Sequence, residues 1–536
     1  MLLLLLLVAC GPPPPPPGPG VDVALAVRWT DGVIPRGTAR FHLDADAPPG
    51  TTLWVDGAWW RVDLTLDGAP IGPVFPGYAP LDVPLPALAA GDHTLTVSVS
   101  LPTDETPVLT LPNKNTAPQA GRLELRLRGA ARLGSLAVPL VDGALAPIVT
   151  ATGAPDGASV ELAVSRDGRV AAAWEPVAVG AALPPKRWTG GRWAIGEPQL
   201  YVATAVLRDA AGAVLDVRSE RFGFRDAGLA AGRLVLDGAP SPLLALRAYP
   251  NEDPALVAAS VAEAGANALE LHGTIANGDW YARLDEWGLP VVQVPRCDGK
   301  LWAGGRDVQR TWQMLANELR AQDLRLLAAS AARPALLAWV CEGTDHLRTL
   351  TCGDLHEDPL RRPILGLDLA SAVIDGRHER RSTVPTWITE IGAPAQQHPA
   401  PPSLAAVSFV EAVGPGGPGG VFHPPPRTGD TAEWRTAWAE AASKLGATPW
   451  TLASRRASSV VTVRGLTPGT LVTLDAPWMA TRGATADDTG VARIFTWYEG
   501  DATLRVGTRE VPVTLRADVW EGTRRVDRSV GVDAAQ

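Results

Sequence analysis

Cysteine is scarce in this sequence of 536 residues, which contains only Cys10, Cys297, Cys341 and Cys352. The last three lack the paired spacing of a zinc site, so we expect no metal centre, and we expect no cofactor either. Cys341 and Cys352 could pair in an oxidising compartment, but three is an odd number, so their disulfide state stays open. The cysteines therefore predict no function in the body of the chain.

Positive charge is also in short supply. Lys and Arg number 48 against 57 Asp and Glu, which gives a net charge of −9 and a pI near 5.5. A nucleic-acid partner requires a basic face, so this class of partner is excluded. Phe and Tyr are few as well, at 7 and 5 against 19 Trp. Tryptophan offers a flat surface for stacking on sugars but is also ordinary sandwich core, so the bias is only compatible with a carbohydrate partner.

Long apolar runs are absent after the first ten residues. Met1–Cys10 is too short to span a bilayer as a helix, which favours a signal peptide. Its last four residues, Leu7–Cys10, resemble the lipobox of bacterial lipoprotein signals, which implies that Cys10 is acylated. The alternative is an apolar start without this role, because no Lys or Arg precedes the leucines.

Residues 11–20 are almost pure proline and glycine. Such a stretch stays extended as a semi-rigid spacer, which would hold the folded part clear of a membrane surface. In several bacteria an Asp after the lipid cysteine signals retention in the inner membrane, but the residue after Cys10 is Gly11. The expected location is therefore the cell envelope, with a lipid anchor at Cys10 and with the outer membrane or cell surface favoured.

Two β segments follow the spacer. Trp60–Leu66 and Asp92–Val99 alternate with period two, and Asp67-Gly68 is a turn signal. Short strands with this punctuation predict a β-sandwich or jelly roll. Further along, Gln199–Leu207 and Ala213–Val217 are separated by a turn and predict a hairpin of an immunoglobulin-like sandwich.

Strand-like and helical runs begin to alternate near Asp226. Helices are predicted over Pro254–Ala264, Asp279–Trp287, 306–332 and 432–445. Eight strands are predicted at Leu243–Arg247, Ala268–Leu271, Val291–Val294, Ala335–Val340, Ile364–Leu367, Ala372–Ile374, Thr386–Thr389 and Gly420–Phe422. This alternation predicts a trimmed (β/α)8 TIM barrel, with short or missing helices between the fourth and seventh strands.

A chain of this length is too long for one hydrophobic core and should divide into domains. The fold class is multidomain β plus α/β. The predicted units are a signal peptide (1–10), a linker (11–20), a jelly-roll sandwich (21–129), an immunoglobulin-like sandwich (130–225), the barrel (226–447) and a small C-terminal β-sandwich-like domain with a tail (448–536).

This domain order resembles that of family 2 glycoside hydrolases, the family of β-galactosidases and β-glucuronidases. Segments that resemble the family's sequence occur in the family's order: Leu66–Gly72, Glu197–Tyr201, Arg221–Arg225, Asp285–Gly288, Asp358–Pro363 and Pro385–Gly392. The resemblance implies a carbohydrate partner and hydrolysis of an O-glycosidic bond with retention of configuration. It also implies two catalytic carboxyl groups about 5–5.5 Å apart at the C-terminal face of the barrel.

The predicted nucleophile is Glu390. Pro385–Gly392 resembles the family's strand that carries this residue, and Glu390 stands at the matching position. In this role its carboxylate attacks the anomeric carbon. The other interpretation of Glu390 is a solvated carboxylate at the end of a strand.

The acid/base position departs from the family pattern. The family has an Asn-Glu pair ending five residues after a strand tryptophan, whereas Gly343-Thr344 stands at that distance from Trp339. Threonine cannot act as a general acid near neutral pH. Glu342 is the candidate substitute, because positions 342 and 344 share one face of a strand, although Glu342 lies roughly 6–7 Å deeper. The alternative is that Glu342 is a satisfied buried carboxylate.

Other positions of the predicted pocket have also changed. Glu270 stands where the family has arginine, and it could converge with Glu342 and Glu390, which would raise at least one of their pKa values. The predicted substrate-binding residues are Glu270, His272, His378 and His423.

Two hypotheses follow. The first is a retaining glycosidase with Glu390 as nucleophile and Glu342 as acid/base. The second is a catalytically inactive carbohydrate-binding or scaffold lipoprotein on a hydrolase-like frame. The distance between the two carboxylates would separate them.

Overall fold

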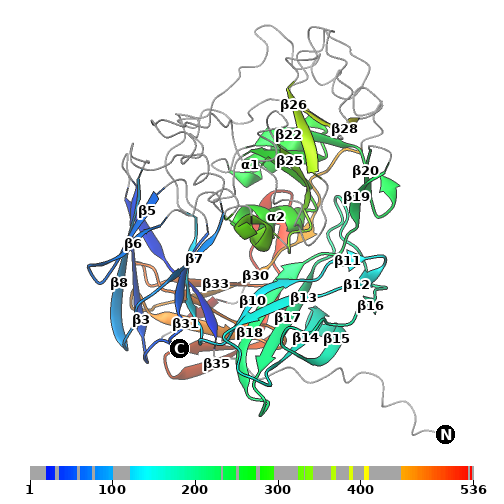
Figure 1. The fold of residues 1–536 in the computed structure, drawn as a ribbon. Helices are drawn as coiled ribbons and strands as arrows, with labels where there is room; N and C mark the ends of the chain where they lie inside the picture. Colours follow the sequence, from blue (N-terminus) through cyan, green and yellow to red (C-terminus); the bar gives the residue numbers. More distant parts are fainter. Residues whose placement is uncertain are drawn as a thin grey trace, which may run out of the picture.

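The computed structural model describes residues 20–30, 35–56, 61–74, 79–100, 121–230, 233–248, 253–272, 278–294, 321, 324–330, 332–341, 364–369, 386–389, 404–409, 448–528 and 531–533. These residues form mostly β-strands. Several open sheets make up the lower part of the molecule in Figure 1, and a closed barrel with its helices lies above them.

The first β segment contributes a five-stranded antiparallel sheet, in the order β2-β3-β8-β5-β6. The hairpin of β5 and β6, at one edge of this sheet, confirms the predicted turn: Asp67 and Gly68 both have positive φ, 51° and 81°, which a two-residue hairpin turn of this kind requires. The strands are β2 (Val27–Thr30), β3 (Arg36–Leu43), β5 (Arg61–Leu66), β6 (Ala69–Val74) and β8 (Gly91–Ser100).

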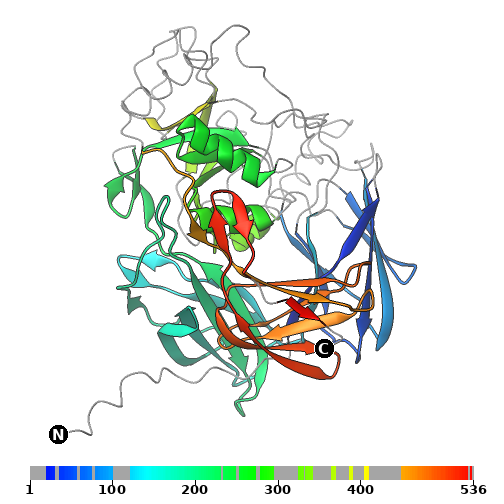
Figure 2. The same ribbon diagram turned by 180° about the vertical axis from the view of Figure 1, so that it is seen from behind.

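An eight-stranded sheet joins the two ends of the chain, in the order β35-β34-β31-β32-β1-β9-β4-β7. Its N-terminal strands are β1 (Val21–Ala24), β4 (Thr52–Val55), β7 (Leu81–Pro84) and β9 (Leu123–Leu127), and its C-terminal strands are β31 (Leu471–Asp475), β32 (Thr481–Thr485), β34 (Gly500–Val506) and β35 (Arg509–Leu515). The junction is a parallel pair, with Val21 opposite Thr481 and Ala24 opposite Ala484. The orange and red C-terminal strands accordingly lie between the blue N-terminal strands and the cyan to green second segment (Figures 1 and 2).

The C-terminal strands share a sheet with N-terminal strands and also have a hydrophobic core of their own. Three alternating segments of this region, Val460–Val463, Leu471–Leu474 and Thr503–Val506, lie within β30 (Ser459–Arg464), β31 and β34. Two of these strands, β31 and β34, belong to the same sheet as the N-terminal strands. Periodicity along the sequence predicts where a strand lies, but not which strand it pairs with. The remaining C-terminal strands are β29 (Arg455–Arg456), β33 (Ala492–Thr496), β36 (Val519–Glu521), β37 (Arg524–Val526) and β38 (Gly531–Asp533).

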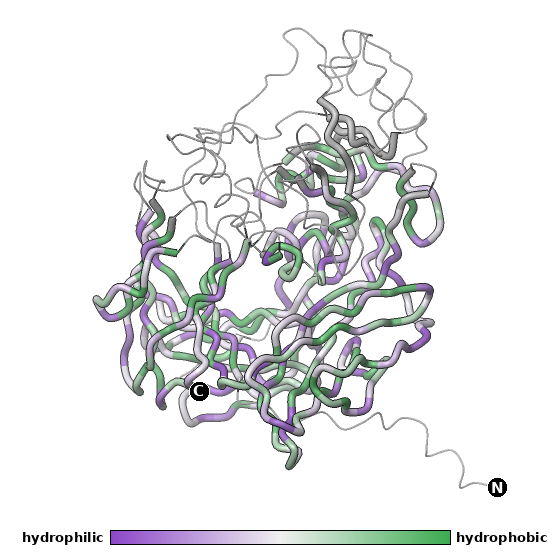
Figure 3. Tube along the Cα trace, in the orientation of Figure 1, coloured by the Kyte–Doolittle hydropathy of each residue, from purple (hydrophilic) through white to green (hydrophobic). Residues whose placement is uncertain are grey.

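The second β segment is built on an antiparallel sheet in the order β15-β14-β17-β18. The predicted hairpin is confirmed, with β17 and β18 paired and Asp209 Oδ1 accepting the backbone N–H groups of Ala211 and Ala213 in the turn. Colouring by hydropathy shows hydrophobic and hydrophilic residues alternating along many of these strands (Figure 3). The strands of the segment are β10 (Arg132–Ala137), β11 (Leu140–Val141), β12 (Ala144–Leu145), β13 (Ile148–Thr152), β14 (Ser159–Arg166), β15 (Arg169–Ala178), β16 (Lys186–Arg187), β17 (Tyr201–Arg208) and β18 (Val214–Phe222).

A small sheet of β19 (Ala227–Ala230), β20 (Arg233–Leu236) and β21 (Ala239–Pro240) leads into a closed barrel of parallel strands. The barrel strands are β22 (Leu243–Ala248), β23 (Ala268–His272), β24 (Val291–Val294), β25 (Leu336–Cys341), β26 (Ile364–Leu369), β27 (Thr386–Thr389) and β28 (Leu404–Phe409). Six of the predicted strands are thereby confirmed.

The barrel has seven strands rather than the predicted eight. β26 pairs directly with β27, so the ring has no place between them for the predicted strand at 372–374. β28 pairs with both β27 and β22 and closes the ring without the predicted strand at 420–422. Both segments lie outside the described residues. β28 is not among the predicted strands, because its short apolar run directly follows a proline-rich stretch that has the composition of a loop.

Two predicted helices are confirmed next to the barrel, α1 (Pro254–Ala264) and α2 (Gly278–Trp287). Asp253 caps α1 through its side chain, which accepts from Ala255 N at 2.8 Å, and Gly265 ends the helix at φ 70°. Residues 324–330 are helical as well, within the predicted range 306–332, and the predicted helix at 432–445 lies outside the described residues. Among the described residues, no helix combines the length and the apolar character needed to cross a membrane.

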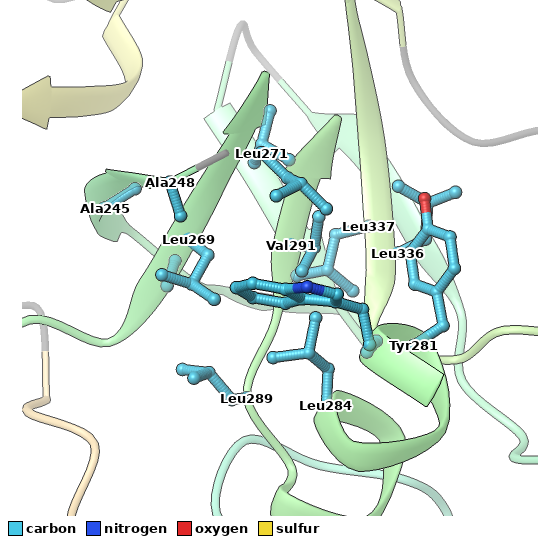
Figure 4. Packing of buried hydrophobic residues seen from close by; sticks show 14 of the residues in the cluster. Ala245, Ala248, Leu269, Leu271, Tyr281, Leu284, Leu289, Val291, Leu336 and Leu337 are labelled. Atoms are coloured by element: carbon cyan, nitrogen blue, oxygen red, sulfur yellow. The ribbon is translucent and has the colours of Figure 1, made fainter. Parts of the chain in front are cut away.

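Helix α2 supplies much of the contact that supports the barrel. Leu284 of α2 points towards the strand residues Leu269 and Val291, and Tyr281 lies on the side of Leu336 (Figure 4). All of these side chains are at most 5% exposed. The continuous apolar contact fixes strands β23 to β25, and therefore fixes where their C-terminal ends lie.

Candidate active site at the barrel mouth

Most predicted site residues lie outside the described residues. Glu390, Glu342, His378, His423 and Cys10 are in this group, so their assigned roles stay predictions. The strands that lead to the two predicted catalytic glutamates are described. β25 ends at Cys341, one residue before Glu342, and β27 ends at Thr389, one residue before Glu390.

Strands β25 and β27 are separated by the single strand β26. Cys341 is opposite Gly366 of β26, and Gly366 is opposite Thr386 of β27. Because adjacent strands are about 4.8 Å apart, the backbones of β25 and β27 are separated by about 10 Å. Two side chains converging from these strands can cover most of that gap.

The stagger of the barrel decides whether the two strand ends lie at the same height. Leu243 of β22 is paired with a residue of β28, which is paired with a residue of β27, and so on around the ring. When this series of pairs reaches β22 again, it arrives about eight residues after Leu243, and this offset is the shear of the barrel. Residues of equal height are therefore offset from their paired partners by about one residue for each strand. With this offset over two strands, Cys341 and Thr389 lie within about one residue of the same height.

Glu270 lies on β23 and has no exposed surface. Its backbone is opposite Arg247 of β22 and Val292 of β24, and two more residues of β23 follow it. His272 ends β23, and nothing further is described for its side chain. The structure therefore places Glu270 within the packed wall of the barrel, below the strand end.

A polar contact that the sequence analysis does not predict links α2 to the barrel. Gln293 of β24 is fully buried, accepts a hydrogen bond from the Tyr281 hydroxyl at 3.0 Å and donates from Nε2 to Leu271 O at 3.0 Å. A buried amide needs such partners to offset its desolvation. The only signal in the sequence is one glutamine inside an otherwise apolar strand.

The opposite end of the barrel holds a carboxyl group with a perturbed pKa. Asp285 precedes β24 and is 1% exposed, and its Oδ1 accepts from Ala335 N at 2.9 Å, just before β25 begins. Burial raises the pKa of Asp285 to about 6, while Arg333, 3.6 Å from Oδ2, lowers it only in part. This group lies at the N-terminal end of the strands. Residues at this end of a barrel contribute to stability, whereas active sites lie at the C-terminal end, so we assign Asp285 a structural role.

Glu286, the next residue, joins three parts of the chain. It is 2% exposed and accepts hydrogen bonds from Arg221 of β18, from Ser458 N at 2.9 Å and from Trp520 Nε1 at 2.6 Å. Burial opposes ionisation, but the Arg221 guanidinium and these hydrogen bonds hold the pKa of Glu286 below its usual value. The carboxylate is therefore fully used in holding the barrel against the second β segment and the C-terminal strands.

The sequence model of the glycosyl hydrolases family 2 matches residues 161–225, the main part of the second β segment. No curated protein matches the sequence.

Solved structures show the same fold. A family 2 β-galacturonidase from Eisenbergiella tayi, bound to glycerol, superposes with a TM-score of 0.57 at 16% identity over 74% of this chain and 89% of the other. A family 2 β-galacturonidase from Eisenbergiella tayi bound to galacturonate gives a TM-score of 0.51 at 19% identity, over 63% of this chain and 64% of the other. A β-glucuronidase from Ruminococcus gnavus gives 0.52 at 14% identity over 67% of each chain. The second β segment therefore resembles family 2 glycoside hydrolases in sequence, and the chain shares the fold of these solved structures.

Proposed function

We propose that this protein hydrolyses an O-glycosidic bond with retention of configuration, using Glu390 as nucleophile and Glu342 as acid/base. The observation that carries the proposal is the position of the strand ends. Cys341 and Thr389 lie at about equal height with one strand between them, and each is followed directly by a glutamate. Glutamates that leave these ends toward one another can reach the 5–5.5 Å separation that a retaining enzyme needs.

The chemistry would run in two steps. The Glu390 carboxylate attacks the anomeric carbon while the bond to the leaving oxygen breaks and Glu342 gives its proton to that oxygen. Water then attacks the glycosyl–Glu390 ester, Glu342 takes a proton from the water, and the carboxylate of Glu390 is released. Because the ends of β25 and β27 lie at about the same height along the barrel axis, Glu342 can meet Glu390 from its own position and need not take the place of residue 344.

The test is turnover of a panel of aryl β-glycosides by the wild type and by three variants. The panel includes glucuronides and galacturonides, because the solved relatives carry these names. We expect Glu390→Gln to abolish turnover and Glu342→Gln to reduce it by about 10²- to 10⁴-fold, with the smallest loss for the best leaving groups. Glu175→Gln, at an exposed position of β15, is the matched control and should keep full activity.

Two results would reject the catalytic assignment. Absence of turnover on every glycoside of the panel is the first, and full activity of Glu390→Gln is the second. A fluoro-sugar that labels Glu390 covalently would support the assignment independently of the rate.

A second candidate function is carbohydrate binding without catalysis. It is favoured by the replacement of the family's Asn-Glu pair by Gly343-Thr344 and by the full burial of Glu270, which stands where the family has an arginine. Glycan-array binding by the wild type, unchanged in Glu390→Gln and without turnover, is the result that this function predicts.

We also propose that the protein is anchored in the cell envelope through a lipid on Cys10. The support is the apolar run that ends in Leu-Val-Ala-Cys and the proline-glycine spacer that follows it.

A further inference from the structure

A cavity of about 340 Å³ lies between the second β segment and the C-terminal segment, and neither hypothesis for the barrel makes use of it. Its wall includes Arg166 and Gln199 from one side and Ser454, Arg455 and Trp497 from the other. The volume is in the range that small-molecule sites occupy, and the wall combines polar and apolar surface. The cavity is therefore large enough for a small organic molecule and not only for a single ion.

Arg455 is the unusual residue of this wall. It is only 8% exposed, yet its guanidinium donates only to backbone carbonyls: Nε to Gly196 at 3.1 Å, Nη1 to Ala453 at 3.1 Å and Nη2 to Thr451 at 2.8 Å. Within the described part of the chain, no carboxylate forms an ion pair with it. Burial accordingly lowers the pKa of Arg455. Buried charges in proteins are normally paired, so this cation lacks a counter-charge.

The acidic residues of the same wall do not supply that counter-charge. Arg456 forms ion pairs with Asp167 and with Glu499, the latter at 2.7 Å, and Glu499 also accepts from Ala517 N. Glu197 is exposed to solvent at the edge of the cavity. The positive charge of Arg455 is therefore left for a group that enters the cavity.

We propose that this cavity binds a carboxylate-bearing saccharide, with Arg455 pairing the carboxylate. A guanidinium matches a carboxylate in geometry and charge, and two of its five N–H groups remain after the three carbonyl contacts. The ring of the sugar fits the remaining volume, where Gln199 accepts from Arg166 through Oε1 and keeps its amide NH₂ to donate, and Ser454 presents a hydroxyl at the rim. The site is separate from the barrel mouth and does not depend on the catalytic assignment.

Isothermal titration of the full chain with glucuronate, glucose and acetate tests the proposal. Glucuronate should bind, whereas glucose lacks the carboxylate and acetate lacks the ring, so both should bind at least tenfold more weakly. Arg455→Gln should weaken glucuronate binding by about 10- to 100-fold, the range expected for loss of a hydrogen bond to a charged group. Arg28→Gln, an exposed arginine paired with Asp488, is the matched control and should leave binding unchanged.

A second variant keeps the test informative if Arg455→Gln does not fold. Ser454→Trp, at an exposed rim position, should block the cavity and abolish glucuronate binding while Arg455 is intact. Glucuronate binding that survives both Ser454→Trp and Arg455→Gln would place the ligand elsewhere and overturn the proposal. Equal binding of glucose and glucuronate, or no glucuronate binding by the wild type, would overturn it as well.

Discussion

Asp285 and Glu286 are consecutive carboxylates at the C-terminal end of α2, and their surroundings give them opposite electrostatic behaviour. Glu286 has an arginine and three other donors, so its ionised form is favoured. Asp285 has one backbone donor, and Arg333 lies 3.6 Å from its Oδ2, which has no hydrogen-bond partner among the described residues. Burial therefore dominates at Asp285 and favours the protonated form.

The raised pKa of Asp285 predicts how stability changes with pH. Between the unfolded value of 3.8 and the folded value of about 6, the folded state holds a proton that the unfolded state releases, so stability falls as pH rises through this window. Asp285→Asn removes the charge and keeps an acceptor for Ala335 N. It should therefore increase the free energy of unfolding at pH 7 by about 1–3 kcal/mol, seen as a higher melting temperature, and by much less near pH 4.

Asp285→Ala is the matched variant for that measurement. It also removes the charge but leaves the Ala335 N–H without an acceptor, so it should be less stable than Asp285→Asn at every pH. Equal melting temperatures of Asp285→Asn and the wild type across pH 4 to 7 would contradict the assigned pKa.

The strands of the shared eight-stranded sheet come from opposite ends of the sequence but form one element. Val23 of β1 and Leu504 of β34 are both fully buried in it, and Ala26 N donates to Thr485 Oγ1 at 2.9 Å across the junction. Cooperative unfolding is therefore expected to include both ends of the chain.

Leu504→Ala tests this coupling. The substitution should cost about 2–5 kcal/mol, as for other buried leucines, and should speed hydrogen exchange in β1 as well as in β34. Leu162→Ala, in the core of the second β segment, is the matched control and should leave exchange in β1 much less affected. Unchanged exchange at Val21–Ala24 in Leu504→Ala would show that the two halves of the sheet open separately.

The strand and helix positions could be predicted from the sequence much better than their partners. Helix α1 carries its own signals, a capping aspartate, a proline at its start and a glycine at its end, and its bounds are predicted correctly. The pairing of β1 with β32 and the seven-strand closure through β28 depend on contacts between residues far apart in the sequence. Motif resemblance predicts Glu390, which lies outside the described residues, whereas the burial and hydrogen bonds of Gln293 and Arg455 become visible only in the fold.

The whole molecule would be attached to a membrane at one point, before the first strand. Cys10→Ala should move the full-length protein from the detergent phase to the aqueous phase in a phase-partition assay, because one acylated cysteine supplies the attachment. Cys297→Ala is the matched control and should stay with the detergent. Detergent partition that persists in Cys10→Ala would reject the lipid anchor at this residue.

The position of β1 also determines how the molecule responds to mechanical load. Any tension transmitted from residues before Val21 enters a strand that is hydrogen-bonded on both sides, to β32 on one and β9 on the other. A pull along β1 stretches both ladders together in shear, so their bonds share the force rather than opening one after another. A pull on the N-terminal end is thus resisted by two ladders, and one of them is formed with residues more than 450 positions away in the sequence.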